Sequence, residues 1–186
     1  MEITKIIPQQ DYSALQSLVA EYLSEGDSIL DICEKYPTTT VGYYFDTCLI
    51  GAAYGVASEF NDGFSLDGIA IIHPYNGVGR GGKLLAFFEK RVALLGYASI
   101  SLGSAGGYVE RFYLKNGYRA AELKILVPPG TTWKNHPAFP VVEVQEQGGY
   151  DKLVLAVADY FAMDKQELTR HYGGEESFFV FTKELL

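Results

Sequence analysis

The pattern of hydrophobic and polar positions predicts alternating short strands and amphipathic helices over residues 1–127. Residues 11–26 place hydrophobic side chains at spacings of three and four, which indicates a helix with one buried face, capped by Asp11. The expected elements are, in chain order, strand 2–7, helices 11–26 and 27–36, strands 41–45, 48–57 and 64–72, helix 84–95, strand 97–102, helix 108–115 and strand 118–127. This order predicts an α/β fold with a mixed, mostly antiparallel sheet flanked by helices.

The pattern changes after residue 127. Residues 131–140 are rich in proline and hold Trp133, which predicts an ordered loop over the core, or alternatively a lid. A strand is expected at 153–158, a helix opened by the capping box Asp164-x-x-Glu167, and a last strand at 177–182. We therefore expect a single domain over 1–186, with a core at 1–126 and a loop plus strand-helix-strand extension at 127–186. The extension either extends the sheet or pairs with another subunit, so a homodimer is one expectation.

The composition is that of a folded globular protein. The chain has 186 residues, of which 48% are hydrophobic and 20% charged, and no apolar run is long enough to span a membrane. The net charge of −8 argues against a nucleic-acid partner. Cys33 and Cys48 form no disulfide framework and are expected to be small buried residues, while His136 and His171 have no partner at metal-ligand spacing. A cytoplasmic protein without a metal is the simplest expectation.

The most informative stretch runs from His73 to Leu85. Four glycines within six residues (77–82) follow a hydrophobic run and precede an amphipathic one, which predicts a strand, a glycine loop and a helix. Glycines let successive backbone N–H groups converge, and the helix N-terminus adds its own free N–H groups and positive dipole end. Basic residues outnumber acidic ones between residues 73 and 91. The stretch therefore predicts an anion site, most often one for phosphate.

Two common phosphate motifs fail here at their discriminating residue. Gly77-x-Gly79-x-x-Gly82 fits the dinucleotide pattern, but residues 97–102 lack the acid that binds the ribose. Gly77-x-x-x-x-Gly82-Lys83 nearly fits a nucleotide P-loop, but Leu84 stands where a Ser or Thr would ligate magnesium.

The same stretch resembles the acetyl-CoA loop of the GNAT superfamily of acetyl-CoA-dependent N-acetyltransferases. The family pattern, (Arg or Gln)-x-x-Gly-x-(Gly or Ala), corresponds to Asn76, Gly79 and Gly81, with Asn76 departing from the usual residue. A second family element, a Phe-Tyr pair followed by a Gly-aromatic pair, is similar to Arg111–Tyr118. The resemblance covers residues 1–126 and implies an acyl-CoA N-acyltransferase-like fold.

The resemblance implies which residues bind acetyl-CoA as the acetyl donor. The last strand residues before the loop would run alongside the pantetheine arm, and their backbone N–H groups near Ile71 and Ile72 would polarise the thioester carbonyl. The glycine loop would bind the pyrophosphate. The expected cofactor-binding residues are Ile71, Ile72, Asn76, Gly77, Val78, Gly79, Arg80, Gly81, Gly82 and Lys83.

Two residues are candidates for proton transfer. The family commonly places a tyrosine at the position of Tyr113, whose phenol could protonate the departing thiolate; its spacing from Val109 is equally that of a packed core residue. Asp67 could accept the proton of the amine, or could simply face solvent on its strand. Glu59 and Glu110 are weaker alternatives to Asp67.

The expected function is therefore acetyl transfer from acetyl-CoA to an amino group of a small molecule or peptide. Two alternatives stay open at this point: a CoA-binding module of the same fold without turnover, and a P-loop-type nucleotide hydrolase. The net charge of −8 favours a cationic acceptor slightly and names none.

Overall fold

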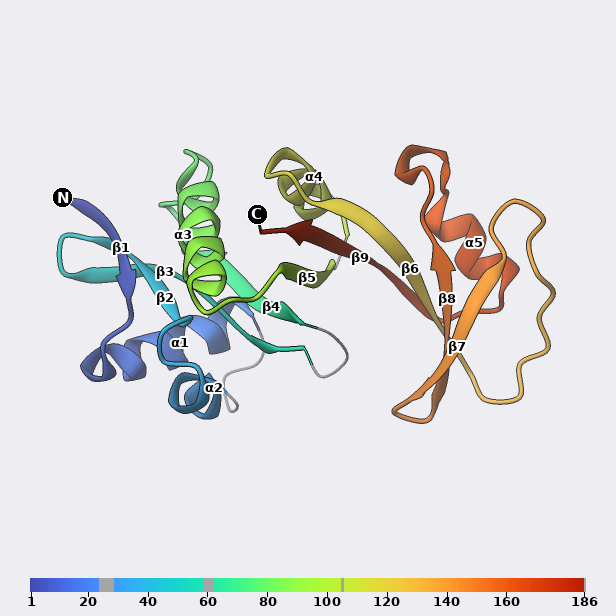
Figure 1. Cartoon of the computed structure of the whole chain (residues 1–186), viewed down its shortest axis with the longest axis horizontal. Coiled ribbons are helices and arrows are strands. Elements are labelled where there is room, and N and C mark those ends of the chain that lie inside the picture. Colours follow the sequence, from blue (N-terminus) through green and yellow to red (C-terminus); the bar gives the residue numbers. More distant parts are fainter. Residues whose placement is uncertain (24–28, 59–61, 105, 186) are drawn as a thin grey trace. The chain divides into compact units, whose positions relative to one another are not determined.

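The computed structural model describes residues 1–23, 29–58, 62–104 and 106–185. In these residues nine strands form a sheet in the order β1-β2-β3-β4-β5-β9-β6-β8-β7, with five α-helices (Figure 1). The sheet is mixed and mostly antiparallel, as the sequence predicted, while β7 was not among the predicted strands. The chain divides into two compact units, residues 1–101 with 184–186, and residues 102–183. Each unit is described by itself below. The expectation of a single domain with a core at 1–126 stays a prediction.

The first unit contains most of the elements that the hydrophobic pattern predicts. Its elements are β1 (Glu2–Ile6), α1 (Tyr12–Tyr22), α2 (Ile29–Lys35), β2 (Val41–Phe45), β3 (Cys48–Ala57), β4 (Gly63–Ile71), α3 (Arg80–Leu94) and the beginning of β5 (Ser99–Ser104). Strands β1 to β4 pair antiparallel in sequence order, and β5 pairs with β4 in parallel.

Helices cover both faces of the sheet in this unit. Side chains of α1 and α2, including Leu15, Val19 and Cys33, pack in one buried cluster with Ala52 and Tyr54 of β3. On the opposite face α3 contacts β2, β3 and β4 (Figure 1). The spacings of three and four on α3 explain this, because they place Leu84, Leu85, Phe88 and Val92 on one buried stripe.

The second unit is built around four antiparallel strands. Its elements are α4 (Tyr108–Lys115), β6 (Arg119–Val127), β7 (Val141–Gln147), β8 (Tyr150–Ala156), α5 (Lys165–His171) and β9 (Glu176–Glu184). Strand β6 pairs with both β9 and β8, and β7 pairs with β8. The extension thus adds strands to a sheet, one of the two outcomes that the sequence left open.

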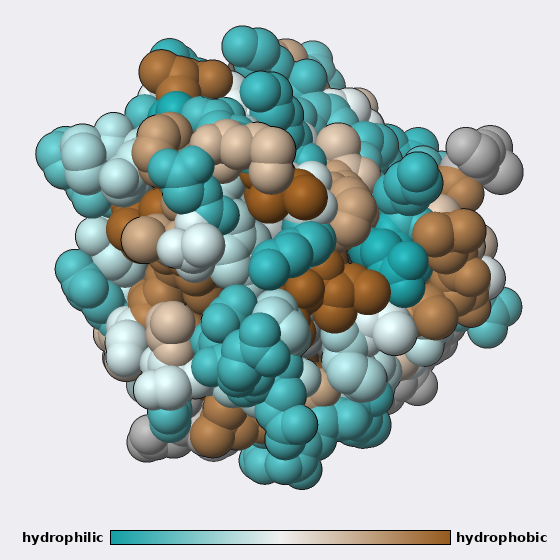
Figure 2. All heavy atoms as spheres, turned by 90° about the vertical axis from the view of Figure 1, so that its left-hand side faces the viewer, coloured by the Kyte–Doolittle hydropathy of each residue, from teal (hydrophilic) through white to brown (hydrophobic). Residues whose placement is uncertain are grey.

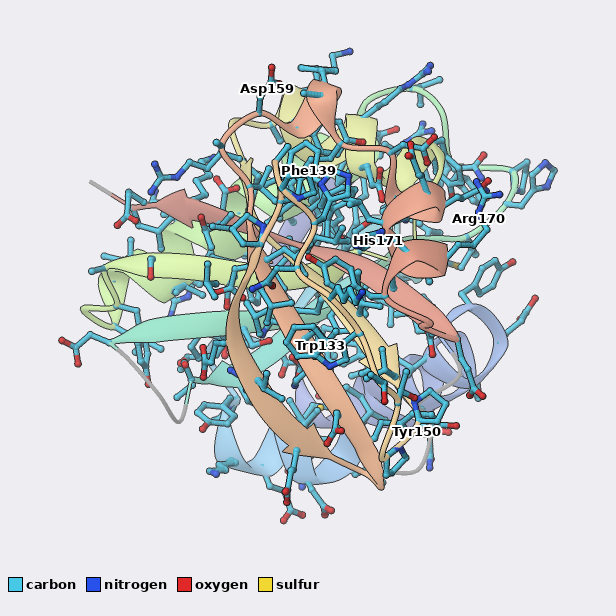
Figure 3. All side chains as sticks on the ribbon, turned by 90° about the vertical axis from the view of Figure 1, so that its right-hand side faces the viewer. Trp133, Phe139, Tyr150, Asp159, Arg170 and His171 are labelled. Atoms are coloured by element: carbon cyan, nitrogen blue, oxygen red, sulfur yellow. The ribbon has the colours of Figure 1, made fainter. Side chains whose placement is uncertain are left out.

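The proline-rich loop at 128–140 is held against α5. The hydroxyl of buried Tyr172 donates to the Phe139 carbonyl at 2.6 Å and accepts from the His136 N–H at 2.9 Å. Trp133 packs edge-on against the Tyr172 ring, with ring centroids 5.9 Å apart. Figure 3 labels Trp133, Phe139 and His171 in this unit. These contacts confirm the expectation of an ordered loop.

Several local predictions are confirmed and others are wrong. Asp164 accepts from the Glu167 N–H at 3.0 Å, as its capping motif predicted. Asp11 precedes α1 but does not cap it, because its carboxylate accepts from the Tyr44 hydroxyl instead. Cys33 is buried as expected, whereas Cys48 is exposed because it begins β3 at a turn. Leu95 is also exposed, since α3 ends one residue earlier.

The surface gives little indication of a partner. On the face that Figure 2 shows, hydrophobic residues lie in small patches between hydrophilic ones, so its coloured residues do not form one continuous hydrophobic surface. In the described ranges, no helix has the length and hydropathy needed to cross a bilayer. The homodimer stays a prediction.

Candidate functional site

Strand β4 carries an irregularity at Asp67. Tyr54 of β3 pairs with Gly68, and the next residue, Gly55, pairs with Leu66, so Asp67 is an extra residue without a partner on β3. Such a β-bulge bends a strand and redirects the side chains beside it. On its other side β4 pairs with β5 only over Gly63–Ser65. Among the described residues of the first unit, β4 therefore has no strand partner on that side beyond Ser65.

Within the described part of the first unit, alternate backbone N–H groups on the second half of β4 have no strand partner. The Ile72 N–H donates to the Ile50 carbonyl of β3 at 2.9 Å. The N–H groups of Ile69 and Ile71 point the opposite way, because successive amides in a strand alternate between its two sides. The Ile72 N–H is therefore engaged with β3, whereas the N–H groups of Ile71 and Ile69 point away from β3. That N–H groups near Ile71 and Ile72 polarise a carbonyl stays a prediction.

The glycine loop leads into α3, whose N-cap residue provides no side-chain cap. Gly79 occupies the N-cap position, and the first helical turn contains no acidic residue. Lys83 is the first residue whose N–H bonds back into the helix, to the Gly79 carbonyl at 3.2 Å. The N–H groups of Arg80, Gly81 and Gly82 precede that bond and lack a partner within the helix. Such N–H groups suit an anion, and the anion site predicted for this position stays a prediction.

Two of the loop glycines need a backbone conformation that other residues rarely adopt. Gly77 and Gly79 both have a φ of 83°. A Cβ added to either would meet no heavy atom within 4 Å, so packing is not the reason for glycine here. The reason is the left-handed conformation, which turns the backbone toward the helix N-terminus.

Arg80 is held by the protein rather than facing an anion. Its guanidinium donates to the Glu2 carboxylate from Nε at 3.0 Å and to the Tyr75 carbonyl from Nη1 at 2.8 Å. Glu2 also accepts from the Tyr43 hydroxyl at 2.6 Å, and these bonds, the one from Arg80 first, hold the pKa of Glu2 below its usual range. The Arg80 side chain therefore fastens the loop to β1. Its backbone N–H, at the start of α3, is a separate donor that these bonds do not use.

The other predicted loop residues are accessible. Asn76, Val78 and Lys83 are all exposed, and Val78 keeps 65% of its surface in contact with solvent. The structure thus brings residues 71–83 together as one strand, loop and helix start. The role of Lys83 in holding an anion stays a prediction.

Asp67 lies at the bulge with its carboxylate turned toward Ser65. The Ser65 hydroxyl donates to Asp67 Oδ1 at 2.7 Å. Asp67 is exposed as a residue, yet protein atoms crowd its carboxyl group, and this partial burial raises its pKa. A carboxylate of raised pKa is a better proton acceptor than a solvated one. Its role as general base stays a prediction.

Tyr113, on α4 in the second unit, is buried in an aromatic cluster. Its ring contacts Phe112, Tyr118 and Phe181 at centroid distances of 5.2, 5.6 and 6.1 Å. Burial raises the pKa of Tyr113 to about 12, so the phenol is protonated at neutral pH. Its hydroxyl bonds to no residue that the structure describes. The ring therefore packs, and the hydroxyl keeps a proton to donate.

The alternative bases are not supported equally. Glu110 is buried and engaged: it accepts from the Tyr160 hydroxyl at 2.5 Å and pairs with Lys165 Nζ at 3.0 Å. These bonds make it a structural carboxylate of the second unit. Glu59 lies outside the described residues. Within those residues, no group of three potential ligands could hold a metal ion.

Comparison with known proteins supports the fold. No family model and no curated protein sequence matches the chain. Among solved structures, N-acetylglutamate synthase from Neisseria gonorrhoeae, complexed with coenzyme A and N-acetyl-glutamate, matches all of this chain with a TM-score of 0.60 and 12% identity. This chain spans only 35% of that protein.

Two smaller proteins match along most of their own length. Aminoglycoside 6'-acetyltransferase type Ii has a TM-score of 0.60 and 17% identity, covering 99% of this chain and 97% of its own. Naa50 of Arabidopsis thaliana, in complex with the bisubstrate analogue CoA-Ac-MVNAL, has a TM-score of 0.56 and 14% identity, covering 85% and 99%. Together with the architecture above, these matches show that the chain has the fold of the GNAT acetyltransferases.

Proposed function

We propose that this protein is an N-acetyltransferase that moves an acetyl group directly from acetyl-CoA to an amine. One observation carries the proposal: within the first unit, β4 after Ser65 pairs with β3 alone, and it leads through the glycine loop to a helix whose first N–H groups have no partner within the helix. A single segment thus offers N–H groups of Ile69 and Ile71 along a strand and those of residues 80–82 at its end. This arrangement suits a long ligand with a phosphate at one end and a carbonyl at the other.

Each part of this segment has a task in binding acetyl-CoA. The N–H groups of Arg80, Gly81 and Gly82 would hold the pyrophosphate, and Lys83 would add a positive charge. The part of β4 after Ser65 would bind the pantetheine arm, so that the thioester lies near the bulge at Asp67. From Ser65 to Ile71 an extended strand spans roughly 20 Å, which is enough to separate phosphate from thioester. Positioning of this kind replaces an encounter in solution by a local reaction.

The reaction requires two proton transfers. The neutral amine attacks the thioester carbonyl, and the resulting oxyanion would be stabilised by a β4 N–H group. The carbon–sulfur bond then breaks, the nitrogen loses a proton and the thiolate gains one. We propose Asp67, directly or through a water, as the acceptor of the first proton and Tyr113 as the donor of the second. The amine acceptor is proposed to be a small molecule or a peptide.

A second candidate function is a CoA-binding module without turnover. The packing of Tyr113 in an aromatic cluster favours this module, because packing alone is a sufficient reason for a tyrosine here, without any role in proton transfer. The nucleotide hydrolase loses support, since Leu84 is a buried residue of α3 and its side chain has no oxygen to bind magnesium.

Ligand-dependent melting and thiol release together test the proposal. Acetyl-CoA and CoA should raise the melting temperature, because ligands stabilise the state that they bind, whereas NAD and ATP with magnesium should not. Acetyl-CoA with a panel of amines should release free CoA thiol. Stabilisation by CoA without thiol release on any amine would support the binding module. Stabilisation by ATP with magnesium alone would contradict both functions.

A further inference from the structure

A hollow of about 590 Å³ lies in the first unit beside the beginning of β4. Lys35 and Tyr36 line it from the end of α2, Val56 from β3, and Ser65 and Ser101 from β4 and β5. Its volume is within the range of small-molecule sites, roughly 300–1,000 Å³. None of these residues belongs to the loop that would bind acetyl-CoA.

Strand pairing fixes which face of the sheet the hollow occupies. Ser65 is the register partner of Ser101 on β5 and of Val56 on β3, and paired residues present their side chains on the same face. Val56 is two residues beyond Tyr54, which packs under α1 and α2. The hollow is therefore on the face of α1 and α2, opposite α3.

This face brings the hollow next to the proposed base. Ser65 lines the hollow and donates to Asp67 at 2.7 Å, so the carboxylate is one hydrogen bond from its wall. If the amine reacts beside Asp67, as the proposed function requires, the remainder of the acceptor lies in the hollow. The polar groups there then determine which amines are accepted.

The charge in the hollow is opposite to that of the whole chain. Lys35 is the one charged residue among those described that line it, and the others with polar groups are neutral hydroxyls. The Lys35 ammonium lies 5.3 Å from the centre of the Tyr36 ring, and none of the ion pairs formed by the described residues includes it. A polyamine would place a second cation beside Lys35, which is unfavourable. A carboxylate there would gain an ion pair and hydroxyl donors.

We propose that the acceptor is an amine that also carries a carboxylate, with its amino group at Asp67 and its carboxylate toward Lys35. The inference rests on the proposed acetyl transfer and narrows its substrate class. It reverses the expectation from the net charge of −8, which favoured a cationic acceptor. The charge of Lys35 should affect the choice of acceptor more than the net charge does, because exposed charges farther than about 10 Å apart are largely screened at 0.1 M salt.

Matched amine pairs test this. Initial rates of thiol release at saturating acetyl-CoA are measured for glycine, β-alanine, 4-aminobutanoate and two tripeptides, each against its primary amide. The amide keeps the reacting amine and removes the negative charge. For the best pair the carboxylate should be preferred about two- to fivefold, the range for an exposed ion pair, and the difference should lie in KM because Lys35 does not touch the reacting atoms.

Charge variants of Lys35 provide the second arm. Lys35→Met should abolish the preference, and Lys35→Glu should reverse it toward the amide and toward diamines. Lys90→Glu makes the same charge change on exposed α3, outside the hollow, and should leave the preference unchanged. The preference should also weaken as salt increases.

The outcomes separate this inference from the proposed function. Thiol release with equal rates for acids and amides, a preference that Lys35→Glu does not change, or release with polyamines alone would overturn the carboxylate acceptor and leave acetyl transfer standing. Acetyl-CoA binding with no release from any panel member, acid or amide, would overturn the carboxylate acceptor and would support the binding module. Failure of acetyl-CoA to bind at all would overturn the proposed function itself.

Discussion

Two segments of this chain have the same order of elements, a strand followed by glycines and the start of a helix, but they differ in the charge of the first helical turn. In the first unit β4 leads through Gly77 and Gly79 to α3; in the second β5 leads through Gly106 and Gly107 to α4. All four glycines have positive φ. From the sequence, either loop could precede an anion site.

The difference lies at the third residue of each helix. In α4 this residue is Glu110, a buried carboxylate paired with Lys165 and bonded to Tyr160. In α3 it is Gly82, and the first turn contains no acid. A carboxylate in the first turn satisfies the positive end of a helix, so α4 has its anion built in while α3 lacks one. Glycine-rich loops are therefore anion sites only where the chain itself leaves them unneutralised.

The largest expected effect is a loss of turnover, which tests whether α4 contributes to the reaction while α3 binds phosphate. If α4 contributes to chemistry rather than phosphate binding, Tyr113→Phe should lower turnover by about 10²–10⁴ and hardly change the affinity for acetyl-CoA. Steady-state kinetics and calorimetric titration measure both. Tyr108→Phe, which removes an exposed hydroxyl from the same helix, is the control. Unchanged turnover in folded Tyr113→Phe would leave Tyr113 a packing residue only.

Asp67→Asn should lower kcat/KM by about 10², the lower end of the range for a general base, and keep the bond from Ser65. Crowding raises the pKa of Asp67, so wild-type kcat/KM should fall as the pH drops through a value above the ordinary aspartate range.

A raised carboxyl pKa destabilises the fold once the group ionises, so the Asp67→Asn variant should melt slightly higher than wild type at pH 7. Asp62→Asn is the exposed control. A variant as active as wild type would exclude Asp67 as the base.

Giving α3 the charge of α4 tests the comparison directly. Gly82→Glu should raise the KM for acetyl-CoA by about 10–100-fold relative to Gly82→Gln, because the two side chains differ in charge and hardly in size. Both variants should fold, since Glu and Gln are well tolerated in the first turn of a helix. Equal KM values for the two would place the pyrophosphate elsewhere.

The reverse change should affect stability instead of binding. Glu110→Gln weakens the bonds to Lys165 and Tyr160 and should reduce the free energy of unfolding by about 1–3 kcal/mol, as for buried charged hydrogen bonds. Chemical denaturation measures this, with exposed Glu146→Gln as the control. Loss of acetyl-CoA affinity without loss of stability would mean that Glu110 serves the ligand.

The smallest effect concerns Asn76. Replacing it with arginine, one of the usual residues of the resembling family, should tighten acetyl-CoA binding about two- to fivefold, as expected for one exposed ion pair. The gain should shrink in 0.5 M salt, because exposed charges are screened. Calorimetric titration at two salt concentrations measures it. An unchanged affinity would show that the side chain points away from the phosphates.

The parts of the site that depend on local signals could be predicted from the sequence. The glycine loop and the buried stripe of α3 follow from residues close together in the chain. The partner of the Ile72 N–H, the bulge at Asp67 and the bond from Arg80 to Glu2 could not, because each depends on pairing between distant segments. Strand β7 was missed because its polar residues make it resemble a loop.

The bond between Arg80 and Glu2 joins residues 78 positions apart and ties the glycine loop to β1. Strand β1 is at one edge of the sheet order, with β2 as its neighbour. Edge strands of this kind open more readily than central ones. Detachment of β1 would remove the carboxylate that fastens Arg80, and the loop would lose its anchor while the rest of the sheet stayed paired. Ligand binding at the loop and slow amide hydrogen exchange in β1 are thereby linked.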